Sequence, residues 1–336
     1  MTDQVGVIGA GAWGTTLAIR LAEGERPVTL WAHSSEANEE LASRRENVRY
    51  LPGHVLPPNV RVATDDGFLA EPHRLFIMAV PSAHLRSVLK LLAPVLHPGA
   101  AILSAVKGIE EGTHRRMSEV IDEELPGRRL AVLSGPNLAR EIAAGKPASS
   151  VVASLDADLA MELATLIGSD RFRVYTNSDV IGVELCGALK NVVALAAGMV
   201  DGLGFGDSAK AGIVTRGLAE MTRLGVAAGA NPMTFSGLAG VGDLIATCMS
   251  PLSRNRQAGE LLGRGMPWEE VAPRLPGIAE GGYSVRGALA LAQEHSVELP
   301  IAEQVAAVVH DHRPPMAAVA ALMGREQKDE LAGLPR

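Results

Sequence analysis

The spacing of hydrophobic and polar positions changes about halfway along the chain. Up to residue 177, short apolar runs alternate with segments whose apolar residues recur every three or four positions. Short apolar runs bounded by Gly and Pro indicate buried strands, and the longer spacing indicates helices. The predicted strands cover residues 5–8, 28–31, 60–64, 75–80, 101–106, 130–133, 151–154 and 172–175.

Helical segments separate these strands and then continue alone to the end of the chain. The alternation of strand and helix predicts an α/β fold, a Rossmann-like doubly wound and mostly parallel sheet. Past residue 177 only Ala- and Leu-rich helical spacing remains, which predicts an all-helical second domain. A chain of 336 residues fits two domains, and we place the boundary between 1–178 and 179–336. The predicted helices of the second domain cover 181–200, 209–224, 233 onward, 244–249, 255–262, 268–271, 284–294, 301–310 and 316–322.

Three glycines follow the first predicted strand. Gly9, Gly11 and Gly14 form G-A-G-A-W-G, and helical spacing begins at Thr15. A strand, G-x-G-x-x-G and a helix together indicate a dinucleotide site. The first glycine allows a tight turn, the second lets a pyrophosphate approach the backbone, and the third lets helix and strand pack closely. A glycine-rich turn without a ligand is the alternative.

The end of the second strand bears on which nucleotide binds. Enzymes selective for NAD place an acidic residue there to hold the ribose 2′-hydroxyl. Here His33 follows the strand and the first acid is Glu36. We therefore favour NADP(H), with His33 and Arg44 or Arg45 near a 2′-phosphate, and keep NAD(H) as the alternative. Both arginines also fit an ordinary solvated helix end.

Lys190 lies in an otherwise small and apolar helical segment. Its neighbours three and four residues away are Cys186, Gly187, Val193 and Ala194, none of which pairs with an ammonium. Poor solvation would lower the pKa of such a lysine toward the range of proton transfer. The alternative is a lysine that extends its head to water from a half-buried helix. We expect a site in the crevice between the domains, where small ligands commonly bind.

Residues 243–255 combine features of a phosphate site. Asp243 and Thr247 are four residues apart and share one helix face. Ser253 is a candidate N-cap, which leaves Arg254 and Asn255 in a first helical turn. Free amides and a guanidinium there suit a phosphate, although Asp243 and Ser253 also fit a capping role alone.

Two positions in the first domain also attract attention. Lys107 follows the strand that ends near residue 106, and ligands of open parallel sheets bind beyond the carboxyl ends of strands. Asn137 follows another strand and is a candidate cap for the helix at 138–144.

Composition limits the classes of function. The net charge of −7 argues against general nucleic-acid binding. Two cysteines, Cys186 and Cys248, give no disulfide framework and favour a cytoplasmic location. The N-terminus shows no signal peptide, and no apolar run reaches the roughly 18 residues of a membrane span. We expect no membrane insertion and no metal. The helical half could present an apolar face for a homodimer.

The motifs together resemble one enzyme family. G-A-G-A-W-G, A-V-K-G, S-G-P-N-L-A-R-E, C-G-A-L-K-N-V-V-A-L-A-A-G, G-V-G-D-L-I-A-T-C and S-R-N-R occur in this order. Together they resemble the bacterial type of NAD(P)-dependent glycerol-3-phosphate dehydrogenase. The resemblance implies that Lys190 donates and accepts the proton. It implies substrate contacts from Lys107, Gly135, Asn137, Lys190, Asn191, Asp243, Thr247, Ser253, Arg254 and Asn255. It implies cofactor contacts from Gly9, Gly11, Ala12, Trp13, Gly14, His33, Lys107, Ala139, Arg254, Ile278 and Glu280.

The resemblance implies an oxidoreductase that interconverts dihydroxyacetone phosphate, a small phosphorylated triose, and sn-glycerol 3-phosphate for glycerophospholipid synthesis. Asn137 departs from the family, which usually has Ser or Thr there, so the contact at that position is open. Two alternatives remain at this point. One is a β-hydroxyacid type of dehydrogenase with the same architecture, and the other is an NADP(H)-binding sensor without catalysis.

Overall fold

The computed structural model describes residues 4–64, 67, 71–275 and 277–333. The chain divides into two compact units. The first contains Met1–Val106 and Met117–Val180, and the second contains Lys107–Arg116 and Ile181–Arg336. The segment Lys107–Arg116 therefore packs with the second unit, although it lies inside the domain predicted for residues 1–178. That predicted boundary stays a prediction.

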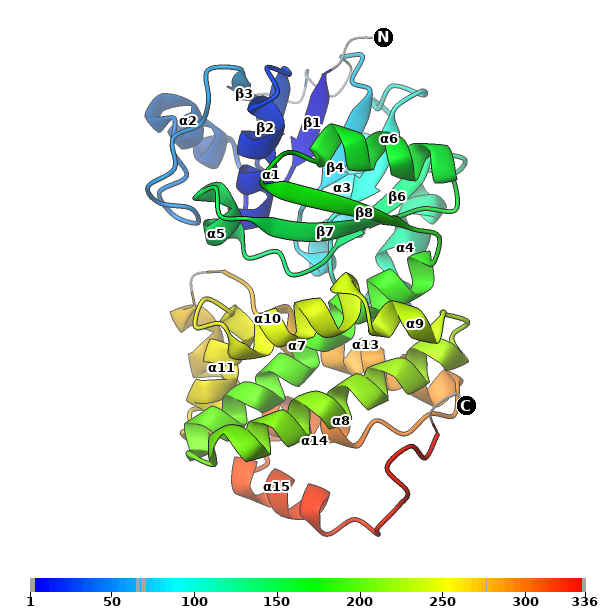
Figure 1. The fold of residues 1–336 in the computed structure, drawn as a ribbon. Helices are drawn as coiled ribbons and strands as arrows, with labels where there is room; N and C mark the ends of the chain where they lie inside the picture. Colours follow the sequence, from blue (N-terminus) through cyan, green and yellow to red (C-terminus); the bar gives the residue numbers. More distant parts are fainter. Residues whose placement is uncertain (1–3, 65–66, 68–70, 276, 334–336) are drawn as a thin grey trace. The chain divides into compact units, whose positions relative to one another are not determined.

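The first unit is built on one sheet of eight strands among the described residues (Figure 1). The strand order is β3-β2-β1-β4-β5-β6-β7-β8. Every neighbouring pair is parallel except β6 and β7, which are antiparallel. The predicted doubly wound, mostly parallel sheet is thus confirmed. The strands are β1 (Val5–Ile8), β2 (Val28–Trp31), β3 (Val60–Val62), β4 (Leu75–Met78), β5 (Ala101–Ser104), β6 (Leu130–Ser134), β7 (Ala148–Ala153) and β8 (Phe172–Asn177).

Alternate residues of these strands enter two separate cores. Leu75 and Ile77 of β4 pack in one cluster, while Phe76 and Met78 pack in the other. Since successive side chains of a strand point to opposite faces, this division requires helices on both faces. The first cluster takes in α1 (Ala12–Ala22), α2 (Ser35–Arg44), α5 (Ala139–Ala143) and α6 (Ala157–Ile167), and the second takes in α3 (Leu85–Leu92) and α4 (Met117–Glu124).

The helix predicted for 83–93 begins with a tighter turn than expected. Ser82–His84 forms the 3₁₀ segment η2 directly after Pro81, and α3 follows from Leu85. Pro81 is the N-cap of this segment and has an extended backbone (ψ 146°), and 3₁₀ turns are frequent at the N-termini of α-helices.

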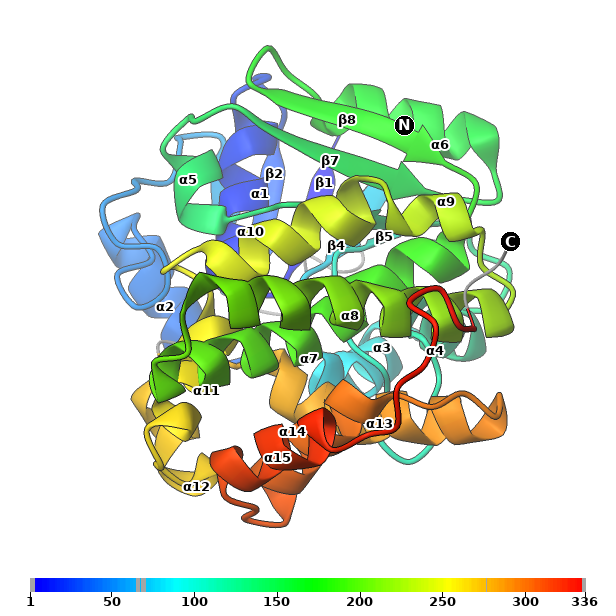
Figure 2. The ribbon, with the colours of Figure 1, turned by 60° about the horizontal axis from the view of Figure 1, so that its bottom comes forward.

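The second unit contains helices and no strand within its described residues (Figure 2). The predicted all-helical domain is confirmed in this respect. Its elements are α7 (Val180–Leu203), α8 (Gly206–Ala227), α9 (Pro232–Phe235), η3 (Leu238–Gly242), α10 (Asp243–Met249), α11 (Arg254–Gly263), α12 (Trp268–Val271), η4 (Ala272–Arg274), α13 (Glu280–Glu294), α14 (Pro300–His310) and α15 (Pro315–Met323).

The helix predicted from residue 233 onward is divided into two short pieces. α9 ends at Phe235, and the π-helical turn η3 follows before α10. A side chain at Gly240 would lie 2.0 Å from the carbonyl oxygen of Phe235, so the close turn depends on glycine. π-helical turns occur often at functional sites, and this one leads directly into Asp243.

α7 is the central helix of the second unit. It is long and apolar enough to cross a membrane, contrary to the sequence-based expectation that no run would be. Within the described residues, however, 89% of its most apolar window is buried inside the protein. It also carries the buried charges of Glu184 and Lys190, so its apolar surface is accounted for as the core of a helical unit.

Candidate functional site

The glycine loop between β1 and α1 has the features of a dinucleotide cradle. Gly9 has φ +111°, a conformation that favours glycine. A Cβ at Gly14 would lie 1.9 Å from the carbonyl oxygen of Gly9, whereas a Cβ at Gly11 would meet no protein atom within 4 Å. No side chain caps the N-terminus of α1. The loop therefore leaves space and helix-terminal amides on one side, which fits a pyrophosphate.

Buried side chains hold this loop in place from behind. The amide of Asn47 donates to the carbonyl oxygen of Ala10 at 2.8 Å and to the hydroxyl of Thr15 at 2.8 Å. The hydroxyl of Thr16 bonds the carbonyl oxygen of Ala139, which brings that predicted cofactor residue to α1. Sequence reasoning missed Asn47, because no motif marks an asparagine that lies 32 residues from its partner.

The residues beyond β2 fit the NADP(H) hypothesis only in part. Arg45 cannot reach a 2′-phosphate in this arrangement, because its guanidinium bonds the carbonyl oxygens of Leu56, Pro57 and Val60. Arg44 is exposed and pairs with Glu40 at 3.1 Å on the same helix. His33 is exposed and packs edge-on against Trp31. His33 and Arg44 remain the candidates for the 2′-phosphate.

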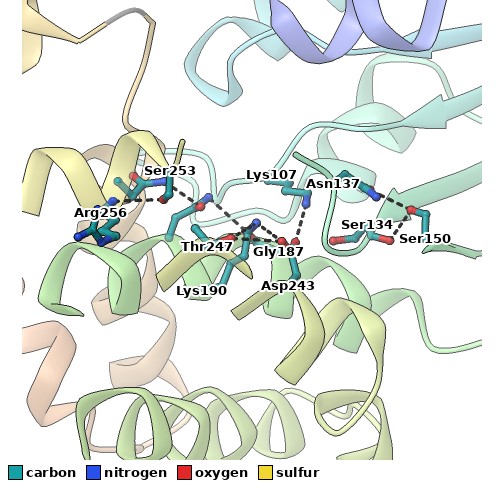
Figure 3. Close-up of polar contacts among 12 residues, drawn as sticks. Lys107, Ser134, Asn137, Ser150, Gly187, Lys190, Asp243, Thr247, Ser253 and Arg256 are labelled. Carbon is teal, nitrogen blue, oxygen red and sulfur yellow. Dashed lines mark hydrogen bonds and ion pairs between the residues drawn. The ribbon is translucent and has the colours of Figure 1, made fainter. Parts of the chain in front are cut away.

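Lys190 forms the centre of a charged cluster in the second unit (Figure 3). Its ammonium donates to the carboxylate of Asp243 and, at 2.8 Å, to the hydroxyl of Thr247. The prediction for Lys190 concerned only its neighbours on its own helix, and the partners seen here belong to another helix. Partners on its own helix are indeed missing from positions three and four away, but α10 supplies them from 53 and 57 residues further along.

The same carboxylate also binds a second lysine. The ammonium of Lys107 lies 2.6 Å from the Oδ2 atom of Asp243, while Lys190 binds Oδ1 (Figure 3). When both lysines are protonated, two ammonium groups and one carboxylate give this cluster a net charge of +1. Asp243 is therefore placed to orient both lysines, and the cluster suits an oxygen that gains negative charge.

Lys107 begins a segment that is fixed to the second unit at both ends. At its far end, Arg116 pairs with the buried carboxylate of Glu184 on α7 at 2.6 Å. Between them, Ile109 packs against Gly287 of α13, where a Cβ would lie 2.8 Å from it. The sequence shows no signal for the pair of Arg116 and Glu184, although Glu184 stands out as a charge on an apolar helix.

Burial changes the acidity of this cluster. The pKa of Lys190 is lowered from 10.5 to about 7, chiefly by burial and also by the charge of Lys107, while Asp243 partly offsets both. Burial alone would raise the pKa of Asp243, but the two lysines outweigh it and lower that pKa below its usual range. An amine with a pKa near 7 can give up and take back a proton at neutral pH.

The N-terminus of α11 lies beside the lysine helix. Ser253 caps it, as predicted, by accepting from the backbone amide of Arg256 at 3.2 Å. The amide of Asn255 donates to Asn191, the neighbour of Lys190, at 2.9 Å. Arg254 is exposed in the first turn. The structure thus joins Lys190, Asn191 and the turn that carries Arg254 within one unit.

Two further predicted cofactor residues lie at or just before the start of α13. The carbonyl group of the Asn255 side chain accepts from the amide of Gly281, which ties this region to α11. Glu280 is the first residue of α13, and Ile278 precedes it. A Cβ at Gly277 would lie 2.5 Å from the guanidinium of Arg254, so this segment and Arg254 are neighbours.

The structure changes the interpretation of Asn137. It does not cap α5, whose N-cap is Leu138 without a side-chain bond. Instead its side-chain oxygen accepts from the hydroxyl of Ser150 at 2.9 Å (Figure 3). Its side-chain N–H donates to the carbonyl oxygen of Ser149 at 3.3 Å. Gly135 nearby has φ +143°. The side chain of Asn137 is thus occupied by residues of β7. Its contact with a substrate stays a prediction.

The two cysteines are free and buried. Burial raises the pKa of Cys248 to about 12, which makes a thiolate at neutral pH unfavourable. Its sulfur therefore behaves as a small apolar group of the core. Within the described residues no group of three His, Cys, Asp or Glu side chains could hold a metal.

Comparisons with known proteins agree with this geometry. The family model described as the NAD-dependent glycerol-3-phosphate dehydrogenase N-terminus matches residues 4–160, and that of the C-terminus matches 179–320. The glycerol-3-phosphate dehydrogenase (NAD(P)+) of Thermobifida fusca is 49% identical over 98% of this chain and 99% of its own length. That of Streptomyces coelicolor is 48% identical over 97% of this chain and 98% of its own.

A solved structure gives the same result. The crystal structure of glycerol-3-phosphate dehydrogenase from Coxiella burnetii has a TM-score of 0.94 and 38% identity, covering 96% of this chain and 99% of its own. Both halves of the chain, the glycine loop and the lysine cluster fall within the matched regions. The chain therefore belongs to the NAD-dependent glycerol-3-phosphate dehydrogenase family.

Proposed function

We propose that this chain interconverts dihydroxyacetone phosphate and sn-glycerol 3-phosphate with NADP(H) or NAD(H). The observation that carries the proposal is the buried Lys190, held by Asp243 and Thr247, with its pKa lowered to about 7. The reaction needs a group that can give a proton to a ketone oxygen and take it back. Family membership supplies the nucleotide and the substrate class.

The proton in this proposal comes from the Nζ atom of Lys190. Within the described residues the ammonium donates two hydrogen bonds, which leaves one of its three N–H groups for the ketone oxygen. As that oxygen takes the proton, the C2=O double bond becomes a hydroxyl and Lys190 becomes a neutral amine. Solvent then returns the proton. The bound NAD(P)H supplies the hydride that C2 receives.

Asp243 and Lys107 support this step electrostatically. The carboxylate holds Lys190 in one direction, and the second ammonium adds positive charge beside the first. Preorganised charges directed at an oxygen that becomes negative lower the barrier, because they need no rearrangement during the reaction. Lys107 thereby takes part through charge rather than through proton transfer.

The phosphate group in this proposal binds at the N-terminus of α11. Arg254 supplies a guanidinium and the first turn supplies helix-terminal amides, both of which favour an anion. The hydrogen bond between Asn255 and Asn191 fixes this turn relative to the lysine helix. A phosphate held there would orient the ketone toward Lys190, which is how remote binding groups accelerate a reaction.

The biological setting follows from the same assignment. The product would supply glycerophospholipid synthesis, the role that the resemblance implies for this family. Two free, buried cysteines are compatible with a reducing compartment, so we place the reaction in the cytoplasm. A homodimer stays a prediction.

One assay tests the proposal against its alternatives. Absorbance at 340 nm follows the consumption of NADPH, or of NADH in a parallel run, when dihydroxyacetone phosphate is added. We expect consumption that requires the phosphorylated ketone. Equal activity on a β-keto acid without phosphate would favour the β-hydroxyacid type of dehydrogenase. Nucleotide binding without any turnover would favour a sensor.

A further inference from the structure

A second charge cluster lies in the helical unit, outside the residues assigned to the reaction, with Lys210 buried and Asp201 and Arg256 half-buried. Asp201 near the end of α7 binds two cations through the same oxygen atom. The ammonium of Lys210 on α8 lies 2.8 Å from it, and the guanidinium Nε of Arg256 on α11 lies 2.7 Å from it. Lys210 is 5% exposed. One carboxylate therefore joins three helices.

Asp201 itself is distant along α7 from Lys190, the proposed proton donor. Asp201 follows Lys190 by eleven residues along α7, which corresponds to roughly 16 Å at the usual rise of a helix. Any effect of Asp201 on the reaction must therefore act through the structure. The ion pair with Arg256 connects Asp201 to the proposed phosphate site, because Arg256 lies in the first turn of α11.

Arg256 connects this cluster to the proposed phosphate site by two different groups. Its side chain pairs with Asp201, and its backbone amide donates to the Ser253 hydroxyl that caps α11. The residue immediately before it, Asn255, binds Asn191 beside the catalytic lysine. A shift of Arg256 would therefore move the cap and the turn that carries Arg254.

α7 and α11 also meet through glycines at this point. A Cβ at Gly198 would lie 2.1 Å from the carbonyl oxygen of Arg256, and one at Gly259 would lie 2.1 Å from that of Leu195. Direct backbone contact leaves no flexible side chains between the helices to absorb a change. The ion pair of Asp201 and Arg256 therefore lies where the backbones of α7 and α11 are in direct contact, so a change in it should shift one helix against the other.

We propose that Asp201 is a positioning residue that sets the place of the phosphate-binding turn relative to Lys190. This inference rests on the proposed function. Without its charge, Lys210 and Arg256 would be left as two like charges beside a neutral group, and they would repel each other. The N-terminus of α11 would then move, while the cluster around Lys190 would keep its own partners.

The experiment compares Asp201→Asn with the wild-type enzyme. We expect KM for dihydroxyacetone phosphate to rise by about tenfold, and the inhibition constant of inorganic phosphate to rise by a similar factor. The value of kcat should change by less than about threefold, and the dissociation constant of NADPH should stay the same. A wild-type KM in folded Asp201→Asn would overturn the inference.

Glu260→Gln is the matched control. Glu260 also lies near Arg256, at 3.7 Å, but within the same helix and four residues further on. We expect this variant to keep the wild-type KM. A rise equal to that of Asp201→Asn would show a general effect of charge near Arg256 and would overturn the assignment to Asp201.

Arg256→Met keeps the test decisive if Asp201→Asn does not fold. It leaves the pair of Asp201 and Lys210 intact and removes only the connection to α11. The same rise in KM and in the phosphate inhibition constant is expected, and an unchanged KM would contradict the proposal. If the wild-type enzyme does not reduce dihydroxyacetone phosphate at all, the proposed function fails. Wild-type turnover with unaltered variants refutes the positioning role alone.

Discussion

The glycine loop of the first unit and the lysine cluster of the second are built from different parts of the chain. The loop is one stretch of six residues in which backbone shape does the binding, and Gly14 is needed because no side chain fits there. The cluster takes side chains from positions 107, 190, 243 and 247, each held by a charge or a hydroxyl. We therefore expect substitutions that add a side chain to impair the loop, and substitutions that remove a charge to impair the cluster.

Removal of the lysine should have the largest effect. Lys190→Ala deletes the proton donor, and we expect kcat to fall by about 10² to 10⁴-fold, since general acid catalysis contributes that much. The fold and the binding of NADPH should persist, because the glycine loop belongs to the other unit. Steady-state rates and nucleotide titration check both points. Retention of a tenth of the activity or more would remove Lys190 from the chemical step.

Arg254→Ala should weaken substrate binding next. A charge-assisted hydrogen bond to phosphate contributes about 1.5 to 3 kcal/mol, so KM for dihydroxyacetone phosphate should rise by roughly 10- to 100-fold. Arg264→Ala is the control and should leave KM unchanged, because Arg264 is the exposed C-cap residue at the far end of this helix and pairs with Glu260. If KM in Arg254→Ala equals that of the wild type, the phosphate binds elsewhere.

Two alanine substitutions in the glycine loop should separate folding from binding. Gly14→Ala places a carbon 1.9 Å from a backbone oxygen and should destabilise the first unit by about 1 to 3 kcal/mol. Gly11→Ala meets no protein atom within 4 Å, so it should fold normally yet raise the dissociation constant of NADPH. Thermal unfolding and nucleotide titration distinguish the two. Normal nucleotide binding by Gly11→Ala would contradict the cradle.

The pH dependence should report the buried amine. Because the pKa of Lys190 is lowered to about 7, the proton donor is lost as pH rises through that value. The rate of ketone reduction should therefore fall above pH 7, while that of alcohol oxidation should rise. Rates in both directions between pH 6 and 9 test this. Lys190→Arg should abolish the dependence, since guanidinium does not deprotonate in this range.

The lowered pKa of Lys190 also predicts how the free energy of unfolding depends on pH. The folded pKa lies below the unfolded value of 10.5, so the unfolded chain binds the proton more tightly. The contribution of Lys190 to the free energy of unfolding should accordingly rise with pH between about 7 and 10.5. Denaturant unfolding of the wild type and of Lys190→Met across this window gives the measurement. The free energy of unfolding of the wild type should rise with pH relative to that of the variant. A difference between the two proteins that does not change with pH would show that the pKa of Lys190 is not lowered.

The two arginines beyond β2 should differ from each other, and the smallest effect on stability is expected at Arg44. Arg45→Ala loses bonds to three carbonyl oxygens and should lower the free energy of unfolding by about 1 to 3 kcal/mol. Arg44→Ala should change stability by less than about 0.5 kcal/mol, because it is an exposed ion pair. It should raise KM for NADPH by a few fold and leave NADH unaffected. Equal effects on both nucleotides would exclude Arg44 from a 2′-phosphate site.

Much of the fold could be predicted because its signals are local. Runs such as Leu75–Met78 are buried on both faces, so a continuous apolar stretch marks them without further information. Ser253 could be identified as a cap because a helix N-terminus needs an acceptor within a few residues. Local signals failed where a distant partner competes with a neighbouring one. The preference of asparagine for helix N-termini predicted a cap at Asn137, but its side chain bonds β7 and not the helix that follows it.

The sequence by itself determined the alternation of strands and helices, the glycine loop and the unusual position of one lysine on an apolar helix. Only the tertiary structure decided the partners of that lysine, because Asp243 and Thr247 approach it across more than fifty residues of chain. The same holds for Lys210 and Arg256, which lie on two different helices and contact the same carboxylate oxygen of Asp201 on a third. Backbone conformation depends on neighbouring residues, whereas a buried charge is satisfied by whichever side chains packing places beside it.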